Sequence, residues 1–223
     1  LEPAAVDPAA LNDATGGFLF FNLYRSLFRL DKKNIPAPER AEKCTWTDLN
    51  KLRLLCWLKP DLKFSNGETI KAQHWVLAWR RLVNPQVGSR HSELLLPLLN
   101  AQRIIAGQVE PDQLGVKALD DRTLEIQLQY ADSEFLYKIS SPVLTPLFEN
   151  PPTNPEQFAT MIGTGPYRIV EWLRKSRVRL EPNPFYHIQN KRPAVEVLMI
   201  EEDSTALQMF DLGKLDFLRR LNI

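Results

Sequence analysis

The sequence lacks any apolar run long enough to cross a membrane. A spanning helix needs about 20 consecutive apolar residues, and polar or charged residues interrupt every apolar stretch well before that length. The first residues, Leu1-Glu2-Pro3, show neither the basic region nor the apolar core of a secretory signal peptide. We therefore expect no direct membrane span, and any signal peptide would already have been removed.

The chain also has little net charge. Its 28 Lys and Arg residues stand against 27 Asp and Glu residues, which leaves a formal net charge of +1 at pH 7. Proteins that bind nucleic acid usually carry a basic surplus, because the phosphate backbone supplies much of the affinity. The composition therefore gives no reason to expect nucleic acid as a partner.

Motifs for catalysis or metal binding are missing as well. The three histidines, His74, His91 and His187, are far apart, and none has another His, Cys or acidic residue at a metal-ligand spacing. The sequence contains no nucleophile elbow, phosphate loop or zinc-protease motif. We predict no metal, no cofactor and no enzymatic activity. A catalytic triad assembled from distant residues would leave no such motif and is the remaining enzymatic alternative.

Cysteine is scarce, and the two that occur bracket a predicted hairpin. Cys44 and Cys56 flank a polar loop at residues 48–51. If residue 44 lies opposite residue 56, both sulfurs share one face of the hairpin with Trp46 and Leu54, and a disulfide is possible. A register shifted by one residue would instead leave two buried thiols that pack as small apolar side chains.

Apolar residues are plentiful, at 44% of 223 residues, so a chain of this length can bury roughly 70% of its unfolded surface. We expect one large domain or two small ones. In residues 55–83 an apolar strand leads through a Ser-Asn-Gly turn into a helix. Its apolar side chains recur at helical spacing on one stripe: Trp75, Val76, Trp79, Leu82 and Val83. The helix should end before Asn84-Pro85, because a residue that precedes proline disfavours the helical conformation.

Three further segments have readable patterns. Residues 123–129 alternate apolar and polar side chains after a turn at 120–122, which predicts a strand. Residues 162–172 contain a Gly-x-Gly, but Pro166 follows at once and Arg168 stands where a third glycine would be, so we reject a dinucleotide-binding loop. Residues 18–28 are apolar nearly all round, which predicts a buried helix.

Together these segments resemble the family 5 extracellular solute-binding proteins, the receptors of ABC importers for oligopeptides, dipeptides, nickel and related solutes. The resemblance rests on residues 58–85, on residues 104–128, and on the Gly-Pro-Tyr turn at 165–167 with its following strand. Two positions depart from the family pattern. Lys71 replaces the usual capping Thr or Ser, and His74 replaces an acidic residue, so we expect a weakly held helix start.

The resemblance implies an α+β fold. The chain would be one lobe of a periplasmic binding protein, built of two subdomains with mixed β-sheets and flanking helices, with the second lobe absent. Residues 1–35 plus 150–223 would form a discontinuous first subdomain, and residues 36–149 an inserted second one. The polar, proline-marked segments at 32–42 and 145–160 would carry the chain between them.

The resemblance also implies a ligand-binding segment. In peptide-binding relatives the polar connection before the first helix lies in the cleft and pairs with the peptide backbone as an extra strand. The matching positions are Asn12, Asp13, Ala14, Thr15 and Gly16. The alternative is a helix cap and turn with no ligand role.

A second connection approaches the cleft in relatives and often supplies a Pro-Tyr pair. Here the matching residues are Arg90 and His91. A cationic or titratable pair at this position would select acidic ligands, and a solvated loop is the equally simple alternative.

The function implied is that of a substrate-binding receptor of an ABC importer that captures extended peptides, oligopeptides above all, in a cleft. The partners would be the peptide or another small solute and a membrane permease, and the protein would be a monomer in the periplasm or on the cell surface, with or without a lipid anchor. One lobe alone offers half of the ligand contacts and no closure, so we expect weak binding. The alternative is a solute-binding lobe kept as a non-transport sensory or interaction module.

Overall fold

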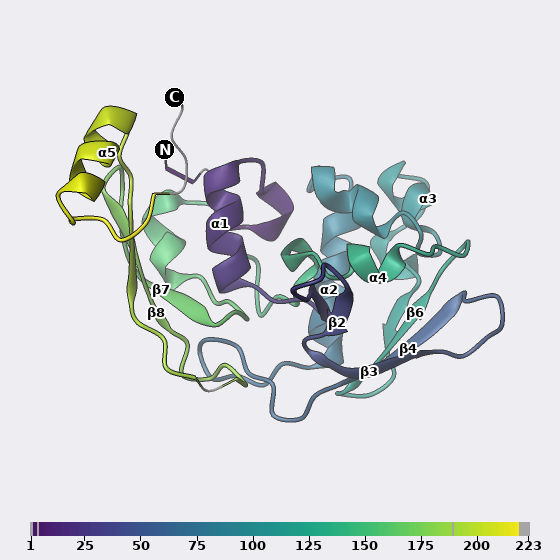
Figure 1. Ribbon diagram of the computed structural model, residues 1–223. Helices are drawn as coiled ribbons and strands as arrows, with labels where there is room; N and C mark the ends of the chain where they lie inside the picture. The colour runs from purple at the N-terminus through teal and green to yellow at the C-terminus, as the bar shows by residue number, and fades with distance from the viewer. Residues whose placement is uncertain (1, 4, 189, 219–223) are drawn as a thin grey trace.

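The computed structural model describes residues 2–3, 5–188 and 190–218, and within them the chain forms antiparallel sheets with flanking helices. Figure 1 shows a three-stranded sheet at one end of the lobe, a four-stranded sheet at the other, and helix α1 (Ala14–Leu23) between them. The α+β class predicted from the sequence is confirmed.

The four-stranded sheet has the order β3-β4-β6-β5. Residues 54, 56 and 58 of its central strand β4 are buried, and so are 124 and 126 of β6, as their alternating pattern requires. The turn before β6 forms where predicted, with the Asp120 carboxylate accepting the N–H groups of Arg122 and Thr123 at 2.8 Å each. The strands run over Ala41–Trp46 (β3), Arg53–Leu58 (β4), Val116–Ala118 (β5) and Thr123–Gln127 (β6).

Helix α2 (Ala72–Val83) packs on β5 and β6. Its apolar stripe is buried as predicted, with Trp75 and Trp79 fully enclosed, and its C-cap is Asn84. Shorter helices complete this half of the lobe. They are α3 (Ala101–Ile105), α4 (Phe135–Lys138) and the 3-10 turns η2 (Arg90–Leu95), η3 (Pro111–Gln113) and η4 (Pro142–Leu144).

The three-stranded sheet has the order β7-β8-β9. In β8, Val178 and Leu180 are buried while Arg177 and Arg179 lie on the other face, as their alternation predicts. Helix α5 follows β9, and the 3-10 turn η5 contacts β7. The bounds are Pro155–Thr160 (η5), Tyr167–Leu173 (β7), Arg177–Pro182 (β8), Val195–Leu198 (β9) and Asp203–Asp211 (α5).

A third, two-stranded sheet joins β1 (Phe28–Leu30) to β2 (Pro36–Pro38). It spans the predicted boundary at residue 35, because β1 precedes that boundary and β2 follows it. One continuous hydrophobic core also includes buried residues from both predicted subdomains. The division into 1–35 plus 150–223 and 36–149 stays a prediction.

The first helix differs from its prediction. It was expected over residues 18–28 but runs from Ala14 to Leu23. It begins early because the Asp13 carboxylate accepts the N–H of Gly16 at 2.6 Å and so caps the first turn. It ends early because Tyr24 is extended. The helix is not buried all round either, since Phe21 is 63% exposed.

Candidate functional site

The segment that precedes α1 is tied to the body of the lobe by side chains. Its 3-10 turn η1 (Pro8–Ala10) is preceded by Asp7, whose buried carboxylate receives Nη1 and Nη2 of Arg81 from α2 at 3.0 and 2.5 Å. The Tyr24 hydroxyl donates to the carbonyl of Val6 at 2.7 Å. Helix α2, through Arg81, and Tyr24 at the end of α1 therefore hold the start of this segment.

The end of the segment is held by residues of the second predicted connection. Ser89 Oγ donates to the carbonyl oxygen of Ala9 at 2.7 Å, and His91 Nε2 lies 2.7 Å from the carbonyl oxygen of Leu11. A carbonyl only accepts hydrogen bonds, so His91 must carry a proton on Nε2 here. The structure thus joins His91 to the residue directly before Asn12, which brings together the two connections predicted to form the site.

The predicted ligand segment is shorter than expected. Asn12 is exposed and Asp13 is half-buried with extended backbone, φ −131° and ψ 155°. Residues 14–16 belong to the first turn of α1 and not to a connection. The alternative of a helix cap therefore applies to Asp13, while a ligand role for residues 12–16 stays a prediction.

Arg90 is exposed next to the half-buried His91 at the start of η2. The contact of His91 with the Leu11 carbonyl shows that this residue is not simply part of a solvated loop. Selection of acidic ligands by this pair stays a prediction.

The start of α2 has no acidic residue in its first turn, as expected, but it has a hydrogen bond that the sequence did not predict. His74 Nδ1 accepts the backbone N–H of Lys71 at 2.9 Å, so the imidazole performs the role of the usual acidic residue. Lys71 Nζ lies 2.9 Å from Asp121. Burial, and then the charge of Lys71, lower the pKa of His74, which keeps the ring neutral and its Nδ1 able to accept.

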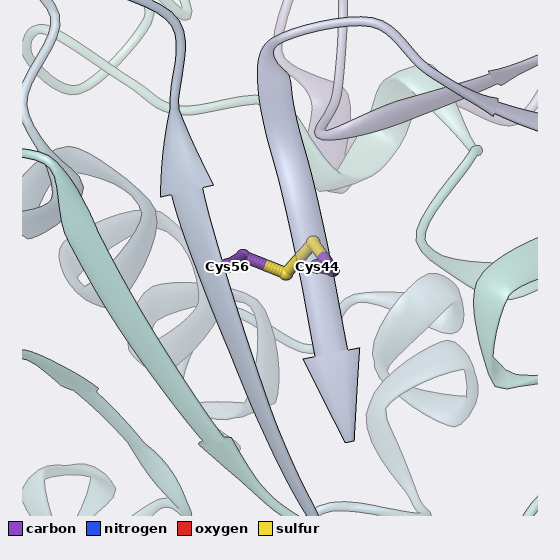
Figure 2. Close-up of a disulfide and its surroundings, with 2 residues drawn as sticks. All are labelled: Cys44 and Cys56. Atoms are coloured by element: carbon purple, nitrogen blue, oxygen red, sulfur yellow. A yellow bond between two sulfur atoms is a disulfide. The ribbon is translucent and has the colours of Figure 1, made fainter. Parts of the chain in front are cut away.

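The two cysteines lie directly opposite each other in the β3–β4 register, and the structure joins their sulfurs in a disulfide (Figure 2). Their Cα atoms are 4.1 Å apart. Trp46 lies opposite Leu54 in the same register, as the first of the two sequence hypotheses requires. The disulfide links the edge strand β3 of the four-stranded sheet covalently to its neighbour β4.

A surface recess on that sheet contains none of the predicted site residues. Lys43 Nζ lies over the Trp57 ring, 4.6 Å from its centroid, and Arg122 forms an ion pair with Glu42 at 3.1 Å. Both cations of the recess already have partners, so neither one marks a ligand-binding site.

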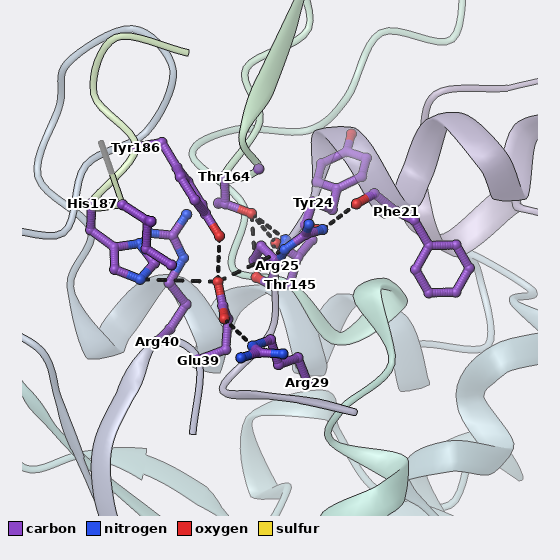
Figure 3. Close-up of polar contacts among 12 residues, drawn as sticks. Phe21, Tyr24, Arg25, Arg29, Glu39, Arg40, Thr145, Thr164, Tyr186 and His187 are labelled. Atoms are coloured by element: carbon purple, nitrogen blue, oxygen red, sulfur yellow. Dashed lines mark hydrogen bonds and ion pairs between the residues drawn. The ribbon is translucent and has the colours of Figure 1, made fainter. Parts of the chain in front are cut away.

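A pair of buried charged residues lies in the polar segment 32–42, where sequence patterns indicated only a linker. Glu39 is 2% exposed and Arg40 is 0% exposed. The side chains that enclose them include Tyr186 and His187, which lie about 147 positions further along the chain (Figure 3). A local pattern cannot reveal such a partner.

The described part of the chain contains no group of three or more His, Cys, Asp or Glu side chains that could hold a metal ion. The same residues include no helix of the length and apolarity that crossing a bilayer demands.

The matches among solved structures show the class of the fold, which is one lobe of a periplasmic solute-binding protein. Among solved structures, the substrate-binding domain of an oligopeptide ABC transporter from Bacillus anthracis matches with a TM-score of 0.88 and 28% identity, over 96% of this chain and 43% of that one. OppA of Listeria monocytogenes bound to peptide matches with a TM-score of 0.86 and 27% identity, over 96% and 44%.

The chain belongs to the bacterial extracellular solute-binding proteins, family 5, whose middle-region profile matches residues 36–223. Curated relatives include the dipeptide-binding protein DppE of Bacillus subtilis, 29% identical over 221 residues, and the periplasmic oligopeptide-binding protein OppA of Salmonella typhimurium, 28% identical over 226 residues. A probable deoxycholate-binding periplasmic protein, YgiS of Escherichia coli, is 27% identical. The chain spans about 40% of the length of these relatives, which cover 96% of it.

Proposed function

We propose that this chain is the first lobe of the substrate-binding receptor of an ABC importer and that it captures peptides in an extended conformation. The observation that carries the proposal is the segment at Leu11–Asp13. It is held by His91 on one side and by the start of α1 on the other, in a fold shared with a peptide-bound OppA.

The backbone of this segment suits strand addition. Asp13 is extended, and Asn12 is exposed, so main-chain groups can pair with a ligand backbone. Main-chain hydrogen bonds give affinity without regard to the ligand's side chains. A receptor built in this way accepts many peptide sequences of similar length.

The relatives work in the periplasm or outside the cell, and we extend this location to the present chain. Its partner would be the membrane permease of the importer, and it would deliver peptide as a monomer. The full site would need a second lobe that closes over the ligand.

Titration calorimetry of the chain tests the proposal with three ligands: an L-tripeptide, its D-enantiomer, and deoxycholate, which the name of one relative suggests. The proposal predicts heat from the L-tripeptide alone, with an affinity weaker than micromolar, because one lobe supplies half of the contacts. The D-enantiomer has the same composition and charge but cannot pair in the same strand register, so it is the matched control.

If the chain binds deoxycholate and no peptide, the proposal of a peptide ligand is wrong and the ligand is an apolar acid. A sub-micromolar peptide affinity would refute the requirement for a second lobe.

A further inference from the structure

A cluster of charged side chains lies around the junction of β2 and β3, with Glu39 and Arg40 buried at its centre, and it has no part in the proposed peptide segment. Glu39 and Arg40 come from this junction, two arginines from the chain after α1, and an aromatic pair from the chain after β8 (Figure 3). The cluster members are Arg25, Arg29, Glu39, Arg40, Tyr186 and His187.

Glu39 has partners on both carboxylate oxygens. Arg29 Nε lies 3.0 Å from Oε2, and the Tyr186 hydroxyl donates to Oε1 at 2.5 Å. Arg25 Nε lies 3.8 Å from the same Oε1. Both oxygens of the only carboxylate among these cluster members therefore already have partners.

Arg40 differs from Glu39 in its partners. Its side chain is 0% exposed, its Nη1 lies 3.2 Å from His187 Nδ1, and its guanidinium sits 5.0 Å from the centroid of the Tyr186 ring. None of the described residues forms an ion pair with it, and its Nε and Nη2 atoms have no hydrogen-bond partner there.

These two atoms form one edge of the guanidinium. The Nε and Nη2 hydrogens point in parallel, which is the arrangement that receives both oxygens of a carboxylate at once. A buried Arg that left this edge unused would carry the full desolvation cost of its N–H groups. The edge therefore has the geometry of a binding site for a planar oxyanion.

The local charge balance favours the same ligand. Arg192 lies over the Tyr186 ring as well, 5.1 Å from its centroid. With Arg25, Arg29 and Arg40, four guanidinium groups therefore lie near one another, and Glu39 supplies the one carboxylate among them. Burial lowers the pKa of Arg40 to about 10, which still leaves it charged at neutral pH. Arg40 is the fully buried one among these cations, and a buried charge is stabilised by an anionic partner.

We propose that the Nε–Nη2 edge of Arg40 binds one small planar oxyanion of the size of formate, acetate, bicarbonate or nitrate. The ligand must be small, because the Arg40 side chain is fully enclosed by the lobe itself. By occupying this edge, the anion stabilises the contact between the β2–β3 junction and the chain after β8.

Thermal unfolding in increasing sodium formate, against sodium chloride at equal ionic strength, tests the proposal. We expect a saturable, formate-specific rise in Tm of about 5 °C at concentrations far above Kd. Arg40→Lys keeps the charge but lacks the two-atom edge, so it should lose this rise. Arg29→Met removes an exposed guanidinium from the same carboxylate and should keep it.

Isotope-labelled formate gives a second readout on the wild-type chain. One bound ¹³C-formate per chain, displaced by nitrate, is the expected result, and it decides the question even if Arg40→Lys fails to fold. Equal Tm in formate and chloride with no bound formate signal would overturn the proposal, as would an unchanged formate effect in Arg40→Lys. A Tm rise caused by a tripeptide acid but not by formate would also overturn it.

Discussion

The Nε2 atom of His91 lies 2.7 Å from the carbonyl oxygen of Leu11, 80 positions earlier in the chain. This contact joins the loop before η2 to the extended residues before α1. The hydrogen bond from Ser89 to the carbonyl of Ala9 lies beside this contact. Together the two contacts fix the path of the segment, and we propose that this segment pairs with a peptide. His91 therefore holds the residue directly before Asn12, and we predict that it positions Asn12 and Asp13 through this contact.

Replacing His91 by Phe should loosen this segment. The ring shape is kept but the donor to Leu11 is lost, which costs about 1 kcal/mol for a hydrogen bond of this kind. Hydrogen exchange at the amides of Asn12 and Asp13 should become several-fold faster. His91→Gln retains an N–H donor and should restore part of the protection. Unchanged exchange in His91→Phe would show that the contact does not position the segment.

The cap of α2 should make stability depend on pH. The folded state lowers the pKa of His74 below its ordinary value near 6.5, so the unfolded chain binds a proton first. The stability from this group is complete above about pH 6.5 and is lost as the pH falls toward the folded pKa. Urea unfolding from pH 7 to pH 5 should show this loss.

His74→Glu is the matched control for that measurement. A carboxylate at this position can accept the Lys71 N–H and stays charged between pH 7 and pH 5. The variant should lose less stability over this range than the wild type. Some loss of stability remains in the variant, because burial lowers the pKa of His187 to about 4. The charged groups that face His187 are Arg40, Glu39, Lys59 and Arg25. Identical pH profiles would contradict the cap.

Reduction of the Cys44–Cys56 disulfide should destabilise the lobe. The bond closes a loop with a sequence separation of 12, and loops of this size contribute roughly 3 kcal/mol by restricting the unfolded chain. We expect Tm to fall by about 6–12 °C in reductant. A Cys44→Ala/Cys56→Ala variant should already have the lower Tm and should not respond to reductant. A wild-type Tm that is the same with and without reductant would refute the prediction.

Gly165 should not tolerate a side chain. Its N–H donates to the Leu23 carbonyl at 2.8 Å, and a Cβ at this position would collide with the carbonyl oxygen of Asn22. Gly165→Ala should destabilise the lobe by about 3 kcal/mol. A methyl group on Gly17 of α1 would meet no atom within 4 Å, so Gly17→Ala should stabilise by about 0.5–1 kcal/mol. Chemical denaturation compares the two, and equal effects would contradict the close approach.

Local patterns predicted the elements whose burial follows from their own periodicity. The stripe that includes Trp75 and Trp79 specified α2, and the Cys44–Cys56 hypothesis anticipated the hairpin register. Helix α1 starts earlier than the apolar pattern predicts, because the Asp13 cap stabilises a first turn that contains Gly16, a poor helix former. The cap and the tertiary contacts of α1 therefore determine where this helix begins.

The candidate site could be predicted only in part. The resemblance singled out Asn12, Asp13 and His91, and the structure brings His91 against the residue before Asn12, while their ligand role stays a prediction. The contact between His91 and Leu11, and the burial of Glu39 and Arg40, depend on residues that are far apart in sequence. Such contacts are products of the tertiary fold.

Peptide capture at the extended segment is the central claim, and backbone NMR of the ¹⁵N-labelled chain during titration with an L-tripeptide tests it most directly, since it detects weak binding residue by residue. The account predicts progressive shifts for the amides of Asn12 and Asp13 and none for exposed amides elsewhere, such as Leu49. Shifts that spare residues 11–16 and gather on another surface, or no shifts at millimolar peptide, would contradict it.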